Sequence, residues 1–121
     1  MPEKIFDLED RLVEFSCRII EAVEALPNSR AGNYVAAQLI RCGLAPSLLY
    51  GEAQSAESRA DFIHKMKMVL KEIRETRINL RIINEKPIVI NEKVVIAFKE
   101  SNELMAIFLK SIETAKNNNT K

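Results

Sequence analysis

Residues 38–83 constrain the fold more than any other part of the chain. They form a nearly all-apolar segment that contains Pro46, then a small polar break at residues 55–58, then a basic amphipathic segment. The apolar residues of both long segments can be placed at the three- and four-residue spacings of an α-helix. A short polar break between two such segments is typical of a helical hairpin. This stretch therefore predicts two antiparallel helices joined by a tight turn.

Helical spacing also recurs on both sides of this hairpin. Pro27 should end the first helix and Pro87 the third, because the residue before a proline is pushed out of helical geometry. Ser58 and Asn91 are good N-caps for the third and fourth helices. Two stripes of residues alternate steps of three and four: Ile5, Leu8, Leu12, Phe15, Ile19, Ala22 and Leu26, and Val94, Phe98, Ser101, Met105, Phe108, Ile112 and Ala115.

We therefore predict helices over about residues 5–26, 30–55, 59–84 and 92–116, with a frayed tail at 117–121. Four such helices with short loops predict an all-α fold, an up-down-up-down antiparallel four-helix bundle in one domain over residues 1–121. Three glycines and four prolines are too few for a protein built of many short strands. The apolar run at residues 88–90 could be a short strand, but without a partner strand we interpret it as a connector.

Pro46 lies inside the predicted second helix. A proline there removes one backbone hydrogen bond and clashes with a carbonyl of the preceding turn, so we expect this helix to be kinked near Pro46, helped by Gly43. Such a break can open backbone carbonyls to a ligand. It can equally bend the helix around a curved core, and this second interpretation is the one we favour.

The second helix is apolar around almost its whole circumference, with only Gln38, Arg41 and Glu52 forming a polar strip. Because a bundle buries one face of each helix, the opposite face should be covered by something else, and a second copy of the chain is the candidate we favour. The alternative is a monomer in which this helix is deeply buried. The predicted oligomer interface comprises Tyr34, Leu48, Tyr50, Phe6, Val13, Met68, Ile78 and Ile82.

The net charge is only +1, but its distribution along the chain is uneven. Residues 1–26 hold three Lys/Arg against seven Asp/Glu, whereas residues 59–86 hold eight against four. Five cations of the third helix fall within about 120° of arc and could follow a phosphate backbone. Alternatively, they meet the acidic first helix within or between subunits, which we prefer. These possible nucleic-acid contacts are Lys67, Lys71, Arg74, Arg77 and Arg81.

Three glutamates are the polar residues of most interest. Glu72 lies at the margin of the third helix's apolar face, and Glu52 ends an otherwise apolar helix. A partly buried carboxylate needs a donor, and Arg41 lies on the same strip as Glu52. We predict a structural polar cluster of Arg41, Glu52 and Glu72. The role of Glu75 is left open.

The chain offers little for catalysis or for metal binding. A di-iron bundle needs two Glu-x-x-His motifs, and the only histidine, His64, stands alone three residues after Asp61. Cys17 and Cys42 lie in apolar segments, where a reactive thiolate is disfavoured. Three scattered glycines cannot form a phosphate-binding loop. We predict that the chain is no enzyme and has no catalytic residue, cofactor or metal.

The run QLIRCGLAPSLLYGEAQSAESRADFIHKMKMVLKEIRET resembles the bacterial four-helix-bundle proteins encoded in intervening sequences of 23S rRNA genes, the S23-like family. In that family the second helix ends with small residues around a proline and then an acidic residue, which match Ala45–Ser47 and Gly51–Ala53. The third helix opens with an acidic residue and Phe, here Asp61 and Phe62. It later carries glutamates, here Glu72 and Glu75, before an aromatic residue that is commonly Trp. This chain has no Trp, and that position falls near Asn79.

The resemblance implies a bundle that forms rings of identical subunits, typically pentamers, and it implies no catalysis. Accessory proteins of diversity-generating retroelements look like relatives that bind nucleic acid. We therefore expect a homo-oligomeric structural or interaction protein, with an accessory protein that binds rRNA or other nucleic acid as the alternative. The chain lacks a basic leader before an apolar run and has no apolar run near ~20 residues, so we expect a cytoplasmic protein without a membrane partner.

Overall fold

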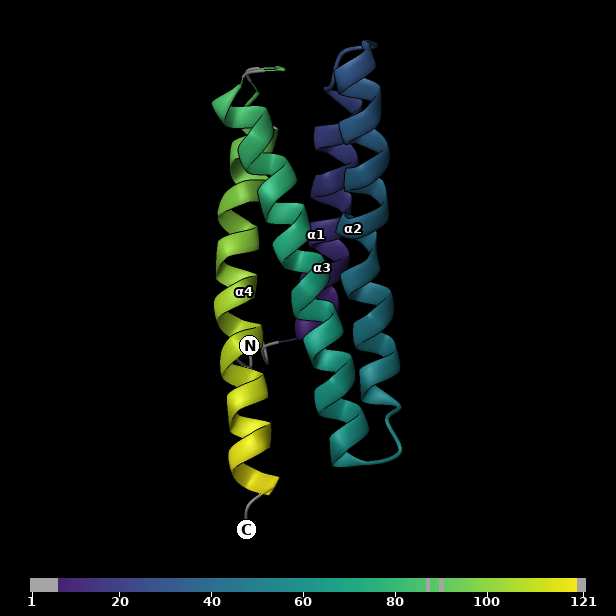
Figure 1. Cartoon of the computed structure of the whole chain (residues 1–121), viewed down its shortest axis with the longest axis vertical. Helices are drawn as coiled ribbons and strands as arrows, with labels where there is room; N and C mark the ends of the chain where they lie inside the picture. Colours follow the sequence, from purple (N-terminus) through teal and green to yellow (C-terminus); the bar gives the residue numbers. More distant parts are fainter. Residues whose placement is uncertain (1–6, 87, 90, 120–121) are drawn as a thin grey trace, which may run out of the picture.

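The computed structural model describes residues 7–86, 88–89 and 91–119. It contains four α-helices: α1 (Leu8–Glu24), α2 (Arg30–Gln54), α3 (Arg59–Glu85) and α4 (Glu92–Asn119). The helices run alternately up and down (Figure 1), and each packs against two neighbours, in the order α1, α2, α3, α4 around the bundle. Helices α1 and α3 therefore stand at opposite corners. The described residues include no strand, so the predicted all-α antiparallel four-helix bundle is confirmed.

Short polar side chains start each helix. The side chains of Asp7, Ser29 and Ser58 accept hydrogen bonds from backbone N–H groups three residues later, which satisfies donors that have no partner within the helix. Asn91 caps α4 in a similar way, accepting from the N–H of Lys93, two residues later, at 2.7 Å. The predicted caps at Ser58 and Asn91 are thus confirmed.

The helix boundaries depart from prediction at both ends of the chain. Helix α1 ends at Glu24, and the N–H groups of Ala25 and Leu26 bond to carbonyls only three residues back, in a tightened last turn. Its predicted residues 5 and 6 lie outside the described residues. Helix α4 continues to Asn119, beyond its predicted end at residue 116, and the fraying of the tail stays a prediction. Backbone hydrogen bonding carries the helix past Ala115, the last residue of its apolar stripe; residues 120–121 lie outside the described part.

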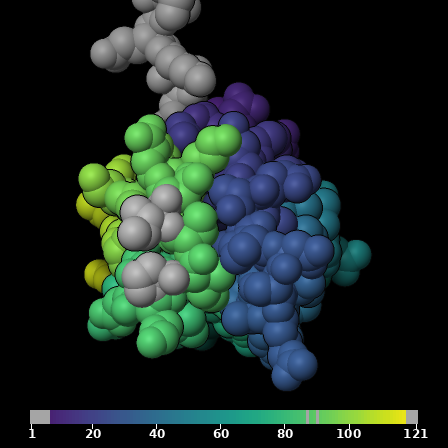
Figure 2. Space-filling view, turned by 90° about the horizontal axis from the view of Figure 1, so that it is seen from above, coloured from purple at the N-terminus to yellow at the C-terminus, as the bar shows by residue number. Residues whose placement is uncertain are grey.

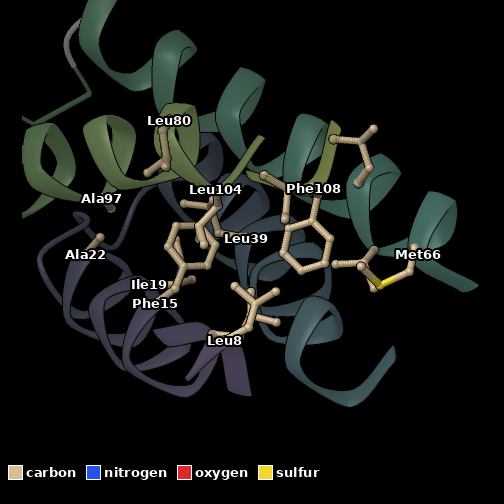
Figure 3. Close-up of a cluster of buried hydrophobic side chains, with 14 of the residues drawn as sticks. Leu8, Phe15, Ile19, Ala22, Leu39, Met66, Leu80, Ala97, Leu104 and Phe108 are labelled. Carbon is tan, nitrogen blue, oxygen red and sulfur yellow. The ribbon is translucent and has the colours of Figure 1, made fainter. Parts of the chain in front are cut away.

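The core runs along the bundle axis and draws on all four helices. Figure 3 shows Phe15 and Ile19 of α1 facing Leu39 of α2 and Leu104 and Phe108 of α4. The buried hydroxyls of Thr76 and Ser101 donate to carbonyls of their own helices at 2.8 and 2.6 Å, so they bring no unsatisfied polar group into the core. The largest fully buried side chains are Leu12, Phe15, Ile19, Leu39, Met66, Val69, Ile73, Leu80, Ile83, Val94, Leu104 and Phe108.

Helices α1 and α2 pack closely at Gly43. A Cβ atom added at Gly43 would lie 2.7 Å from Cγ2 and 2.9 Å from Cγ1 of Ile19, so only glycine fits without movement. The hydroxyl of Ser16 on α1 donates to the Gly43 carbonyl at 3.4 Å, and that of Ser47 donates to the Leu44 carbonyl at 3.1 Å. Both hydroxyls donate hydrogen bonds to carbonyls in the turn before Pro46, which is buried. Proline has no backbone N–H there and interrupts the helical hydrogen-bond pattern. Helix α2 runs unbroken from Arg30 to Gln54, and the kink stays a prediction.

Candidate assembly and nucleic-acid surfaces

The seam between α2 and α3 carries the predicted polar cluster in altered form. The guanidinium of Arg41 donates to Glu75 at 2.7 Å and to Glu72 at 3.4 Å. The hydrogen bond that Arg41 donates to Glu75 is the main reason why the pKa of Arg41 is raised above its ordinary value. The predicted contact between Arg41 and Glu72 is therefore present, and Glu75 joins it as the closer partner.

Glu52 was wrongly assigned to this cluster. It lies eleven residues after Arg41, which is about 16 Å further along the helix axis at 1.5 Å per residue. There it faces the ammonium of Lys65 at 3.6 Å, at the other end of α3. Its side chain is 58% exposed, against 16% for Glu72, so the expected partial burial holds for Glu72 only.

Asn79 lies near the position where the resemblance to S23-like proteins implies an aromatic residue. Its side-chain amide is partly buried between α2 and α3, donating to the Glu75 carbonyl at 3.0 Å and lying 3.9 Å from the sulfur of Cys42. Burial raises the pKa of the Cys42 thiol, so this cysteine stays protonated. Asn79 therefore contributes to the packing between α2 and α3 in this chain.

Three residues of the predicted basic ridge form an exposed patch on the outer side of α3. Lys67, Lys71 and Arg74 are exposed, and none has an ion pair or hydrogen bond with another described side chain. Helices α1 and α3 stand at opposite corners, so the acidic side chains of α1 do not reach the ridge within one chain. The predicted pairing of ridge and first helix is wrong for a single subunit, while pairing between subunits stays a prediction.

The other two ridge residues are already engaged. The guanidinium of Arg77 lies 5.3 Å from the centroid of the Phe98 ring and donates to Asn102 at 2.6 Å, so it belongs to the seam between α3 and α4. Arg81 pairs with Glu85 one turn later at 3.3 Å. The open part of the ridge is therefore Lys67, Lys71 and Arg74, which we call the α3 ridge.

The outer side of α2 is apolar and exposed. Tyr34 is 67% exposed and Leu48 is 70% exposed, and Ile40 is exposed beside them. Most of the predicted interface lies on this side or on the flanking helices: Val13 of α1 and Met68, Ile78 and Ile82 of α3 are all exposed. Exposed large apolar side chains also occur on α4, at Val95, Ile96 and Leu109.

Two residues of the predicted interface, Tyr50 and Phe6, cannot be placed on this exposed apolar surface. Tyr50 is partly buried, and its ring meets that of Phe108 edge to face with centroids 5.9 Å apart, so it belongs to the bundle interior. A helical projection of α2 alone cannot tell this position from the outward ones, because the whole helix is apolar. Phe6 lies outside the described residues.

The side chains that could bind a metal or act in catalysis are not clustered in the described part of the chain. In the part of the chain that the structure describes, no three His, Cys, Asp or Glu side chains are grouped to hold a metal ion. His64 is exposed near the start of α3, Cys42 is buried, and Cys17 is exposed on α1. No helix in the described residues is both long and apolar enough to cross a membrane.

The fold and these surfaces define an antiparallel four-helix bundle with an exposed apolar side. No family model matches the chain, and no curated protein matches it. Among solved structures, a protein of unknown function from the S23 ribosomal protein family of Bacteroides thetaiotaomicron is similar, with a TM-score of 0.80 and 28% sequence identity. The match covers 88% of this chain and 98% of that protein. The resemblance predicted from the sequence is confirmed: this is a four-helix-bundle protein similar to the S23 family.

Proposed function

We propose that this protein is a non-enzymatic structural or interaction module that works as a homo-oligomer. The observation that carries the proposal is the exposed apolar side of α2, with Tyr34, Ile40 and Leu48. The S23-like resemblance favours a ring, and a pentamer in particular. We also propose that the protein is cytoplasmic, in agreement with its two free cysteines, and that it has no catalytic residue.

The energetics support self-association. Burying one large apolar side chain contributes ~1.5–3 kcal/mol, whereas association costs on the order of 4–15 kcal/mol in lost freedom of motion. One or two exposed side chains could not offset that cost. The outer side of α2 with its flanks on α1 and α3 offers several such side chains, which together can offset a cost within that range.

Light scattering coupled to size-exclusion chromatography tests the proposal. The wild-type chain should have a mass of two or more times 13.8 kDa. Leu48→Asp should reduce that mass, because it places a charge in the contact. Leu109→Asp is the matched control, since Leu109 is an exposed leucine on the outer side of α4. Both variants should keep the wild-type helical circular dichroism. A wild-type chain that stays monomeric at all concentrations would refute the proposal.

The α3 ridge supports a second candidate function, an accessory protein that binds RNA or DNA. Lys67, Lys71 and Arg74 have no acidic partner among the described residues, so no intramolecular ion pair must break before a phosphate binds. No Phe, Tyr or Trp stands between the ridge residues along α3, which favours contact with the phosphate backbone over sequence-specific reading.

Fluorescence anisotropy with structured rRNA fragments at two salt concentrations tests the second candidate. Charge reversal of the three ridge residues should abolish binding and its salt dependence. A triple reversal of Lys99, Lys110 and Lys116 on α4 keeps the same net charge change and should bind far better. Absence of wild-type binding at low salt, or equal loss in both triple variants, removes this candidate.

A further inference from the structure

A hollow of about 590 Å³ opens between the start of α2 and the end of α3. Its walls are largely apolar and include Tyr34, Val35 and Ile82, while Arg30 and Lys86 stand at its rim. Neither cation has an ion pair with a described residue. Figure 2 looks onto this end of the bundle, where the start of α2 lies beside the segment that follows α3. We call this hollow the α2/α3 groove; its shape and charge fit an apolar surface edged with carboxylates.

Helix α1 carries such a surface on its outward side. Val13 is 50% exposed and Ile20 is 44% exposed, with exposed Cys17 between them. Glu21 and Glu24 are exposed beside Ile20 and have no cationic partner in the described part of the chain. We call these five residues the α1 stripe. It is apolar with an acidic edge, whereas the groove is apolar with a basic rim.

The two surfaces lie near the same end of the bundle but not at the same level. Ser16 and Ile19 of α1 lie beside Gly43 of α2, so Ile20 is level with about residues 41–42, roughly 10–12 Å from Tyr34 along the axis. The end of α1, the start of α2 and the end of α3 all meet at one end of the molecule, the upper end in Figure 1. Two copies standing side by side with parallel axes therefore bring Ile20 onto Tyr34 and Ile82 when one copy is shifted by about this distance along the axis. Within one chain they cannot meet, since the stripe points outward from its own corner of the bundle.

We propose that the α1 stripe of one copy packs into the α2/α3 groove of the next copy. Ile20 covers Tyr34 and Ile82, and the carboxylates of the stripe meet Arg30 and Lys86. This inference rests on the proposed self-assembly and names the contact that forms it. The charges set the register of the contact more than its strength, and the apolar side chains supply most of its stability.

Such a contact has a consequence for the shape of the assembly. It joins two different surfaces, so every copy in contact through its stripe still has an open groove, and the contact repeats head to tail. With strictly parallel axes, each step combines a rotation with this shift and gives an open helical assembly. Closure into a ring requires the bundles to tilt against the ring axis, so that the shift is cancelled.

Complementation between two assembly-deficient variants tests the contact. Ile20→Lys with Glu24→Lys breaks the stripe and leaves the groove intact, and Ile82→Lys breaks the groove and leaves the stripe intact. Each variant alone should be monomeric. An equimolar mixture should form a species of twice the chain mass, because one intact stripe meets one intact groove while the two cationic broken surfaces repel. Leu109→Lys is the control and should assemble like wild type.

The outcomes separate this inference from the proposed function. If wild type assembles but either variant does too, or if the mixture stays monomeric, the stripe-to-groove contact is wrong and self-assembly stands. If wild type is monomeric, both fail. Should the Ile20 variant lose its cooperative melting, Glu21→Lys with Glu24→Lys reverses only exposed charges. It should weaken assembly at low salt and regain it on mixing with the groove variant.

Discussion

Replacement of Gly43 by alanine should destabilise the protein in the wild-type background and stabilise it once Ile19 is shortened. The cause is the close approach of α1 and α2, where a new Cβ would lie 2.7 and 2.9 Å from two carbons of Ile19. Both carbons are attached directly to the Cβ of a β-branched residue, so they cannot swing away as the end of a flexible side chain could. One helix must move, or Ile19 must leave its rotamer.

The magnitudes have opposite signs in the two backgrounds. Alanine gains about 1 kcal/mol over glycine in helix propensity, whereas overpacking a core costs ~1–3 kcal/mol, so Gly43→Ala should destabilise wild type by roughly 1 kcal/mol. Ile19→Ala alone should cost ~2–5 kcal/mol. In that background the methyl group that Gly43→Ala adds enters vacated space, gaining helix propensity and ~0.8 kcal/mol of apolar burial. The second substitution should then stabilise by about 1–2 kcal/mol.

Urea unfolding of the four proteins of this double-mutant cycle, at one fixed protein concentration, measures the coupling. The control is Gly51→Ala in the same helix, where an added Cβ meets nothing within 4 Å. It should stabilise wild type by ~0.5–1 kcal/mol and be indifferent to Ile19. The reasoning is refuted if Gly43→Ala has the same effect in both backgrounds, since the two residues then do not interact.

Three further predictions concern polar groups. Arg11→Ala should destabilise by about 1–2 kcal/mol, because it leaves a partly buried carboxylate of α4 without its bidentate partner, whereas Arg18→Ala, which removes an exposed pair within α1, should cost no more than ~0.5 kcal/mol in thermal melts. In the Ile82→Lys variant, which should be monomeric, Cys17 should react fast with a thiol reagent, and buried Cys42 only on unfolding; equal rates would contradict the described burial. Glu52→Gln should leave the melting temperature nearly unchanged, and a clear loss would restore a structural role to this carboxylate.

The sequence predicted the helices well because their signals are local. Apolar spacing, a proline after the first helix and capping residues such as Ser58 act within a few residues of where they stand. The outward positions of Tyr34 and Leu48 also followed from one simple argument, that a bundle buries only one side of α2. These features depend on the chain's own periodicity and little on which helix lies beside which.

The pairing of side chains between neighbouring helices was harder to predict from the sequence. Projection placed Arg41 and Glu52 on one strip of α2 but did not show that their distance along the axis assigns them to Glu75 and Lys65, respectively. It also showed Arg77 as one of five equivalent cations, although Phe98 and Asn102 draw it to the α4 seam. Such pairings depend on the stagger of antiparallel helices, which no single helix encodes.

The two candidate functions are compatible when the contact is the stripe-to-groove one, because it uses Ile82 of α3 and leaves the α3 ridge open. The ridge points outward from α3, between the groove on its α2 side and the seam that Arg77 forms on its α4 side. A ring would therefore present one ridge per copy, and a nucleic acid that contacts several ridges at once binds more tightly than one that contacts a single ridge.

This argument predicts a binding difference between two variants of equal charge. Leu48→Asp, which should be monomeric, and Leu109→Asp, which should assemble, both keep the ridge and both add one negative charge. At the same salt and chain concentration, the Leu109 variant should bind a structured rRNA fragment at least about 10-fold more tightly, by anisotropy. Equal affinities with a clear difference in mass would mean that assembly contributes nothing to binding, and the ridge would then have to act one copy at a time.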